Sequence, residues 1–316
     1  MKIRIYDANQ RKQVKSGYGL MAYQLAANLK QLGHEICFFP RKGDTEDVAL
    51  WIRPPHYVKY PEFAKGKKNV FFTMHETEVF EGWKSDWPEL LNRCDAVITP
   101  TQWNKDVFKK HGVKIPIYVV PLGVNSKDFS GSRPYNFSIL TLHDALGKEN
   151  SRENWKDTLK AYYDAFYGEH HSDVRLTIKS YNINYAQYNR DLNEARAGRD
   201  HGNLPMINII DLNLTKEGLN RLYGCHHVFI KNANREGWSL PLWEAMSAGC
   251  KVIHSDLPVF SDVDPRFTRS FTLGSVEGLT TALLDEFRHW KKFKGYINNY
   301  SWNKCSERVD AVLKKT

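Results

Sequence analysis

Short apolar runs alternate along the chain with longer stretches in which apolar residues recur every three or four positions. Runs rich in β-branched and aromatic residues are typical of buried strands, whereas the longer recurrence predicts amphipathic helices. Strands are expected at residues 3–8, 35–40, 48–52, 117–125, 137–142, 174–179, 207–211 and 226–230, and at the start of the segments 69–80 and 94–113. Helices are expected at residues 20–33, 214–225, 241–248 and 276–290, and after the N-cap candidate Thr101. This alternation predicts an α/β fold with doubly wound parallel sheets.

The segment 130–136 (SGSRPYN) is polar and turn-rich, and we interpret it as a linker. At 316 residues the chain is long enough for two domains. We therefore expect an N-terminal Rossmann-like domain at residues 1–131 and a C-terminal one at residues 132–301.

The stretch 235–256 (REGWSLPLWEAMSAGCKVIHSD) carries the strongest chemical signal. It follows the apolar run 226–230, so the order is strand, loop and helix, with Gly249 as the helix stop. Helix N-termini attract anions through unpaired N–H groups and partial positive charge, and phosphate is the usual ligand. Glu236 and Glu244 bracket this anion site, and carboxylates accept hydrogen bonds from sugar or ribose hydroxyls.

This stretch resembles the donor-binding motif of glycosyltransferase family 4, whose members are retaining enzymes of the GT-B architecture. The resemblance implies two Rossmann-like domains facing a cleft, with the terminal helix 302–316 packing back on the first domain. It also implies that Glu236 lies against the donor sugar and that Glu244 holds the nucleotide ribose. The backbone that meets sugar and diphosphate oxygens would be that of Gly237, Trp238, Ser239 and Leu240. The alternative is an ordinary βα unit in which two glutamates fall eight positions apart.

The loop after the strand at 137–142 resembles the family loop that supplies an Arg and a Lys to the donor diphosphate. Arg152 matches the pattern, but Glu153 stands where the Lys is expected. Lys148 or Arg152 would then carry the charge, and we expect Glu153→Lys to be tolerated or activating. Each cation has the alternative of being a solvated surface residue.

Further site candidates lie in the first half of the chain. Gly17 and Gly19 are in the position of a family loop that approaches the diphosphate, although two glycines also suit a plain turn. His75 follows a strand, where the family places a His that contacts the transferred sugar. Trp83 and Trp87 are candidates for stacking on an acceptor, with core packing as the alternative.

The net charge of +9 favours a polyanionic partner, with solubility as the alternative. The sharpest version is a nucleic acid whose base is modified, and an anionic membrane surface with a lipid-linked acceptor competes with it. Basic clusters lie at Arg11, Lys12 and Lys15, at Lys65, Lys67 and Lys68, and at Lys105, Lys109 and Lys110.

Five cysteines without a CxxC pair indicate reduced thiols and a cytoplasmic location, at most peripheral to a membrane. We see no leader and no apolar run of membrane-spanning length.

The pattern and the resemblance together predict a retaining hexosyl- or pentosyltransferase that uses a UDP- or GDP-sugar as donor. No cofactor and no metal are expected, and Asp262 and Asp264 are taken as surface residues. No obligate protein partner is evident. The alternative is a catalytically silent protein that binds nucleotide sugars or glycans, for which Glu153 is the main argument.

Overall fold

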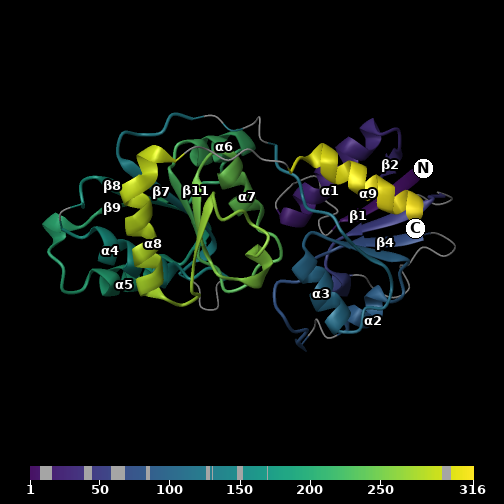
Figure 1. Ribbon diagram of the computed structural model, residues 1–316, viewed down its shortest axis with the longest axis horizontal. Helices are drawn as coiled ribbons and strands as arrows, with labels where there is room; N and C mark the ends of the chain where they lie inside the picture. The colour runs from purple at the N-terminus through teal and green to yellow at the C-terminus, as the bar shows by residue number, and fades with distance from the viewer. Residues whose placement is uncertain are drawn as a thin grey trace. The chain divides into compact units, whose positions relative to one another are not determined.

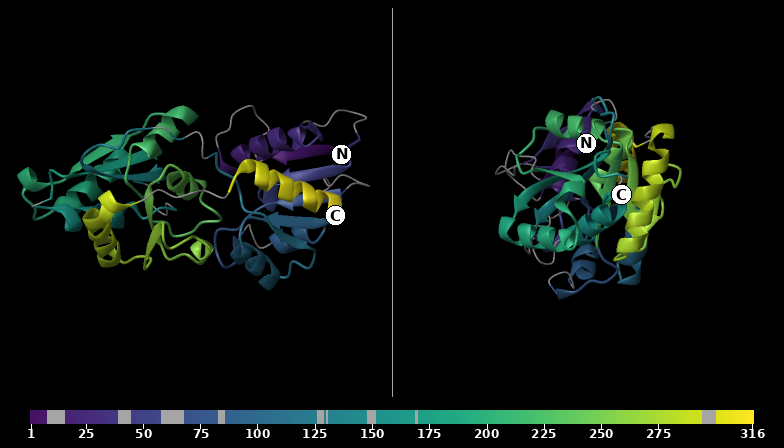
Figure 2. Two further views of the ribbon diagram at one scale, coloured as in Figure 1. Left: turned by 45° about the horizontal axis from the view of Figure 1, so that its top comes forward. Right: turned by 90° about the vertical axis from the view of Figure 1, so that its left-hand side faces the viewer.

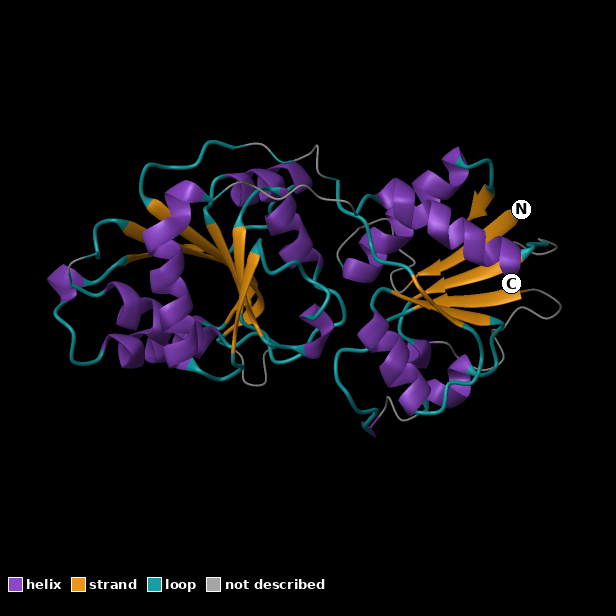
Figure 3. Ribbon diagram, in the orientation of Figure 1, coloured by secondary structure: helices purple, strands orange, loops and turns teal. Residues whose placement is uncertain are grey.

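The computed structural model describes residues 1–7, 16–38, 45–57, 68–82, 86–125, 129, 131–147, 152–168, 170–293 and 300–316. They form two compact units: the first comprises Met1–Val124 and Asn299–Thr316, and the second comprises Asn125–Asn298. Figures 1 and 3 show one sheet with helices on both faces in each unit. The predicted α/β fold with doubly wound parallel sheets is therefore confirmed.

The first unit is built on a six-stranded parallel sheet in the order β2-β1-β3-β4-β5-β6. Its strands are β1 (Lys2–Asp7), β2 (Glu35–Cys37), β3 (Val48–Ile52), β4 (Lys68–Phe72), β5 (Ala96–Thr99) and β6 (Ile117–Val119). Its helices are α1 (Gly17–Gln31), α2 (Trp87–Leu91), α3 (Gln102–Lys110) and α9 (Trp302–Lys315). All five residues of β3 are buried, as expected for a central strand that is covered on both faces.

Side-chain caps determine where several helices begin. The Thr101 hydroxyl accepts a hydrogen bond from the Asn104 N–H, which confirms the predicted N-cap of α3. Ser16 caps α1 in the same way, and Ser301 caps α9.

Helix α9 completes the first unit although it lies far away in the sequence. It lies beside α1 in Figure 1 and in the left view of Figure 2, and the His34 Nε2 is 2.9 Å from the Asp310 Oδ1. At Gly123 a Cβ would come within 2.2 Å of the Trp302 backbone nitrogen, so only glycine permits this approach.

The second unit contains the other six-stranded parallel sheet, in the order β12-β11-β10-β7-β8-β9. Its strands are β7 (Phe137–Leu146), β8 (Val174–Ile183), β9 (Met206–Ile210), β10 (Val228–Lys231), β11 (Lys251–Ser255) and β12 (Thr268–Phe271). Its helices are α4 (Trp155–Phe166), α5 (Tyr185–Arg196), α6 (Lys216–Gly224), α7 (Leu240–Ser247) and α8 (Val276–His289). Helices α4, α5 and α8 cover one face of the sheet, and α6 and α7 cover the other (Figure 1).

The boundary between the units differs from the expected one. The first unit ends at Val124 rather than at residue 131, and the expected linker 130–136 contributes to the second unit. Arg133 donates hydrogen bonds to the carbonyl oxygens of His226 and Ala248, which fixes this segment against β10 and α7. Polar composition suggested a linker, but the arginine anchors the segment.

Candidate functional site

The candidate site lies where the chain order of the second sheet reverses, between β10 and β7. At such a point the loops that follow the two strands diverge and leave a crevice at their carboxyl ends. The loop after β7 carries Arg152 and Glu153, and the loop after β10 carries Glu236. The topology therefore brings together residues that the sequence separates widely.

The two loops are joined by backbone hydrogen bonds. Asn154 donates to the Asn232 carbonyl oxygen at 2.9 Å, and Asn234 donates to the Arg152 carbonyl oxygen at 2.8 Å. Between these bonds, Glu153 forms an isolated antiparallel bridge with Ala233. This short ladder determines which side chains of the two loops face each other.

Four charged side chains meet beside this ladder. The Lys231 Nζ lies 2.9 Å from the Glu236 Oε2 and 3.1 Å from the Glu153 Oε1. The Arg152 Nε lies 3.2 Å from the Glu153 Oε1, and its Nη1 lies 3.7 Å from the Glu236 Oε1. Lys231, Glu153 and Glu236 are buried, whereas Arg152 is one-third exposed. Arg152 is therefore the cation of this cluster that a ligand in solvent reaches first.

The cluster controls the ionisation of its members. Burial would raise the pKa of Glu153, but Lys231 and then Arg152 outweigh burial and lower it to about 2. Burial would likewise raise the pKa of Glu236, and the same two cations lower it below its ordinary value. Both carboxylates are therefore charged at neutral pH. This corrects the expectation for Glu153, whose position is a buried ion pair and does not suit an added lysine.

His143 lies near this cluster at the carboxyl end of β7 and is buried. Its Nε2 is 3.2 Å from the Thr141 hydroxyl, and its pKa is lowered to about 4, chiefly by burial. The imidazole is thus neutral at physiological pH. It adds no positive charge to the four side chains beside it.

The loop that enters α7 has an unusual backbone. Ser239 precedes the helix with a φ of 66°, a left-handed conformation that costs energy for a non-glycine residue. Its side chain is buried, and the hydroxyl has no hydrogen-bond partner among the described residues. Leu240 then begins the helix, Pro241 has no N–H, and the Leu242 N–H donates to the Ser239 carbonyl oxygen at 3.1 Å. A strained backbone and an unsatisfied hydroxyl thus coincide at the predicted anion site.

Glu244 lies on α7, one turn further along the helix. Burial raises its pKa to about 7, and the neighbouring Tyr223 hydroxyl and Lys216 oppose this shift only in part. The two motif glutamates therefore differ: Glu236 is held charged by cations, whereas Glu244 titrates near neutrality.

The two glycines predicted to approach the diphosphate belong to the first unit. Gly17 and Gly19 are in the first turn of α1, and the Gly19 N–H donates to the Ser16 hydroxyl. That N–H is thus used to cap the helix. A role of these two residues in diphosphate binding stays a prediction.

His75 and Trp87 are enclosed within the first unit. The His75 Nδ1 is 2.7 Å from the Thr77 carbonyl oxygen, and its ring packs on Phe80 and against the edge of Trp87. His75 has no exposed surface and Trp87 is 2% exposed. Trp87 is therefore packed in the core, which was the alternative to acceptor stacking. His75 would have to move out of this packing to contact a sugar.

Other candidates fall outside the described residues, namely Trp83, Lys148, Arg11, Lys12, Lys15, Lys65 and Lys67. Lys109 and Lys110 are exposed on α3. Asp264 forms an ion pair with Arg266, and among the described residues no group of three or more His, Cys, Asp or Glu side chains is arranged to hold a metal ion. No described helix has the length and apolar character needed to cross a membrane.

Comparison with solved structures identifies the architecture. Sucrose-phosphate synthase from Thermosynechococcus elongatus superposes with a TM-score of 0.77 and 12% identity, over 100% of this chain and 99% of that one. HepE from Anabaena, in complex with UDP-glucose, gives a TM-score of 0.72 with 11% identity over the whole of both chains. A trehalose-6-phosphate synthase studied for glycosyl transfer with retention gives 0.66 with 13% identity, over 97% of this chain and 80% of that one. The chain has the GT-B fold.

Sequence comparison adds less to this GT-B assignment. A putative glycosyltransferase of the Sulfolobus islandicus filamentous virus (isolate Iceland/Hveragerdi) is 29% identical over 135 residues, which span 38% of this chain and 37% of that protein. No protein-family model matches the chain.

Two residues of the candidate site, Lys231 and His143, were not identified from the sequence. Lys231 was left outside the predicted strand 226–230, yet it is the last residue of β10. A lysine that directly extends an apolar strand is a usable signal, because lysine is almost never buried without a partner. His143 gave no such signal, since its place in the cluster depends on the fold.

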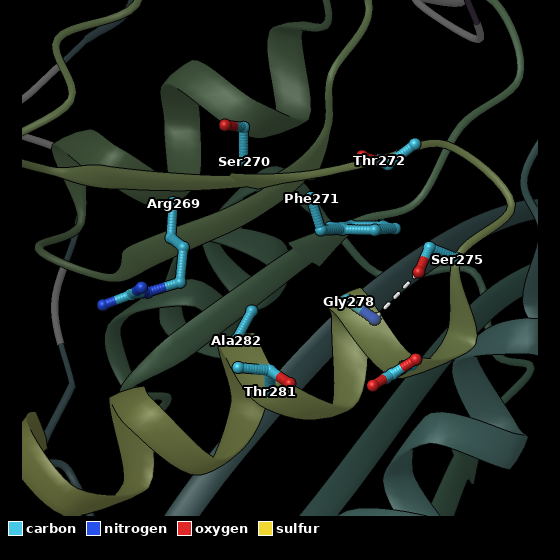
Figure 4. A pocket seen from close by; sticks show the side chains of 9 residues that line it. Arg269, Ser270, Phe271, Thr272, Ser275, Gly278, Thr281 and Ala282 are labelled. Carbon is cyan, nitrogen blue, oxygen red and sulfur yellow. Dashed lines mark hydrogen bonds between the residues drawn. The ribbon is translucent and has the colours of Figure 1, made fainter.

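A pocket of about 400 Å³ lies away from these residues, between β12 and the start of α8 (Figure 4). In Figure 4 the Ser275 hydroxyl accepts a hydrogen bond from the Gly278 N–H. Arg269, which also lines the pocket, forms an ion pair with Glu286. Its lining contains none of the predicted site residues, so we do not assign it to the site.

We predict that Glu153→Lys destabilises the second unit by about 3–5 kcal/mol, because it breaks a buried ion pair and places two buried ammonium groups together. Urea unfolding followed by tryptophan fluorescence measures this change. Adding Lys231→Met should recover part of the loss, since it removes the second ammonium group. An unchanged unfolding midpoint for Glu153→Lys alone contradicts the ion pair.

We also predict that Glu244→Gln raises the thermal unfolding midpoint at pH 8 but not at pH 5. The raised pKa means that the folded state binds the proton more tightly than the unfolded state, so stability is lost as pH rises towards 7. The gain at pH 8 should be about 3 kcal/mol, since the pKa rises from an ordinary value of 4.5 to about 7 and one pKa unit corresponds to about 1.4 kcal/mol. Glu194→Gln, on the exposed face of α5, is the matched control. Equal effects of Glu244→Gln at both pH values refute the assignment.

Proposed function

We propose that this chain is a retaining glycosyltransferase that moves a sugar from a nucleoside diphosphate sugar to an acceptor hydroxyl. The observation that supports it best is the N-terminal end of α7. There a strained serine with a buried, unsatisfied hydroxyl precedes the helix, and two carboxylates of different ionisation bracket it. The comparison with sugar-transferring enzymes of the same fold supports the reaction class, including a relative studied for transfer with retention.

Each site residue takes a distinct role in this proposal. The α7 N-terminus receives the diphosphate, because helix N-termini favour anions. Glu244 accepts hydrogen bonds from the ribose hydroxyls, and Glu236 from those of the sugar. Arg152, the exposed cation of the cluster, neutralises charge as the diphosphate leaves, a contribution on the order of 3 to 4 kcal/mol. Transfer without a metal remains part of the prediction.

A second candidate is a catalytically silent protein that binds nucleotide sugars. The observation in its favour is that Arg152 already contacts both Glu153 and Glu236, so its charge is partly neutralised before a ligand arrives. Hydrolysis of the donor in the absence of an acceptor separates the two, since only an enzyme releases free sugar.

The acceptor is proposed to be polyanionic. The net charge of +9 and the exposed Lys109 and Lys110 on α3 support this proposal. We propose a nucleic acid with a modifiable base as the acceptor, and the alternative is an acceptor on an anionic membrane surface. Binding through phosphates depends steeply on salt because it releases counterions.

The reaction is tested by incubating the protein with a panel of UDP- and GDP-sugars and candidate acceptors, followed by mass spectrometry. Product with the anomeric configuration of the donor, read by NMR, is the expected result. Inverted product rules out retention. Donor that remains intact throughout, although it binds, favours the silent alternative.

Among variants, Glu244→Ala should weaken the affinity for UDP at pH 8 by about 1–3 kcal/mol, since the ribose loses a carboxylate acceptor that is charged above pH 7. Glu236→Ala and Arg152→Ala should instead lower turnover more than they weaken UDP binding. For Arg152→Ala we expect turnover to fall by roughly a hundredfold. Calorimetry and donor hydrolysis measure the two effects, with Glu194→Ala as control. Unchanged UDP affinity in Glu244→Ala removes the ribose role.

For the acceptor, gel shifts with duplex DNA, single-stranded DNA and anionic vesicles at several salt concentrations rank the alternatives. The logarithm of the affinity for DNA should fall linearly with the logarithm of salt concentration. Lys109→Gln/Lys110→Gln should make that slope shallower. No binding to either DNA at low salt ends the nucleic-acid version.

A further inference from the structure

Lys231 occupies a position that is costly for a charged side chain. It is the last residue of β10, after the buried Val228, Phe229 and Ile230, and it is 3% exposed. Removing an ammonium group from water is unfavourable unless the charge is paired. Lys231 therefore depends on the carboxylates of Glu236 and Glu153, at 2.9 and 3.1 Å.

The surrounding backbone leaves this arrangement little freedom. The Asn232 side chain donates to the Asn154 carbonyl oxygen at 3.0 Å and to the Thr158 hydroxyl at 3.2 Å, beside the ladder between the two loops. β10 is thereby joined to the start of α4 immediately after Lys231. The lysine lies between two carboxylates whose backbones are fixed relative to each other.

We propose that Lys231 is a positioning residue, which holds the Glu236 carboxylate in one orientation for the donor sugar, and that Glu153 is the counter-charge that holds Lys231. This inference rests on the proposed function, because it takes Glu236 as the sugar contact. Lys231 acts through Glu236 and does not itself touch the sugar.

The balance of charges in the cluster explains the role of Glu153. Lys231 and Arg152 carry two positive charges, and Glu153 and Glu236 carry two negative ones. Burial would lower the pKa of Lys231, but Glu236 and then Glu153 raise it above its ordinary value. The lysine thus stays charged. It binds the Glu236 carboxylate and is itself held in place by Glu153.

The proposal separates the sugar end of the donor from its nucleotide end. The nucleotide is assigned to the α7 N-terminus and Glu244, which Lys231 does not contact in the structure. Loss of Lys231 should therefore weaken binding of a nucleotide sugar more than binding of the nucleotide alone. A general structural defect would weaken both together.

The test compares the affinities for UDP-glucose and UDP by calorimetry. In Glu153→Gln/Lys231→Met, which removes the cation together with its counter-charge, the ratio of UDP-glucose affinity to UDP affinity should fall about tenfold. Lys231→Arg keeps the charge and should restore most of the ratio. The matched control is Lys179→Met, a buried lysine on β8 whose Nζ donates to the Ser180 carbonyl oxygen. It should leave the ratio unchanged.

An unchanged ratio in the folded double variant overturns the proposal, as does an equal loss of both affinities. If the wild-type protein binds neither UDP nor UDP-glucose, and neither GDP nor GDP-mannose, the proposed function fails. The link between Lys231 and Glu236 is then decided without ligand, by a double-mutant cycle of Lys231→Met and Glu236→Gln in urea unfolding. A coupling of tenfold or more in the unfolding constant supports the orientation of Glu236, and additive effects overturn it.

Discussion

The site of this protein depends on one buried ammonium group held between two carboxylates. A charge in that position is tolerated only because Glu153 and Glu236 come to Lys231 from two different loops. The loops meet because the strand order reverses between β7 and β10, and the short ladder between residues 152–154 and 232–234 holds them. Topology, backbone pairing and charge thus determine one another at this point.

Much of the architecture follows from local sequence. The strand expected at residues 48–52 is β3 at the same residues, because a fully buried central strand is an uninterrupted apolar run. Thr101 is the N-cap it was expected to be, since capping uses only neighbouring residues. The helix after Glu236 and its end at Gly249, with a φ of 85°, also match the pattern.

What sequence does not determine is pairing over long distances. Glu153 and Lys231 are 78 residues apart, so their pairing cannot be predicted from the sequence around either residue. In the sequence, Glu153 therefore indicated the loss of an expected lysine and not a buried ion pair. The start of α1 at Gly17 was not predicted for a different reason, because a glycine tolerates both a loop and the first turn of a helix. Trp87 illustrates a third limit, since aromatic residues suit both cores and binding surfaces.

The discontinuity of the first unit has a consequence for the order of folding. The chain leaves this unit after Val124 and returns at Asn299, so its α1–α9 contact closes a loop that contains the entire second unit. Contacts this distant in sequence are slow to form, and folding proceeds as the chain is synthesised from its N-terminus. The second unit, continuous in sequence, is therefore available to fold before the first is complete. The first unit is complete only when residues 299–316 join it, after the whole second unit has been synthesised.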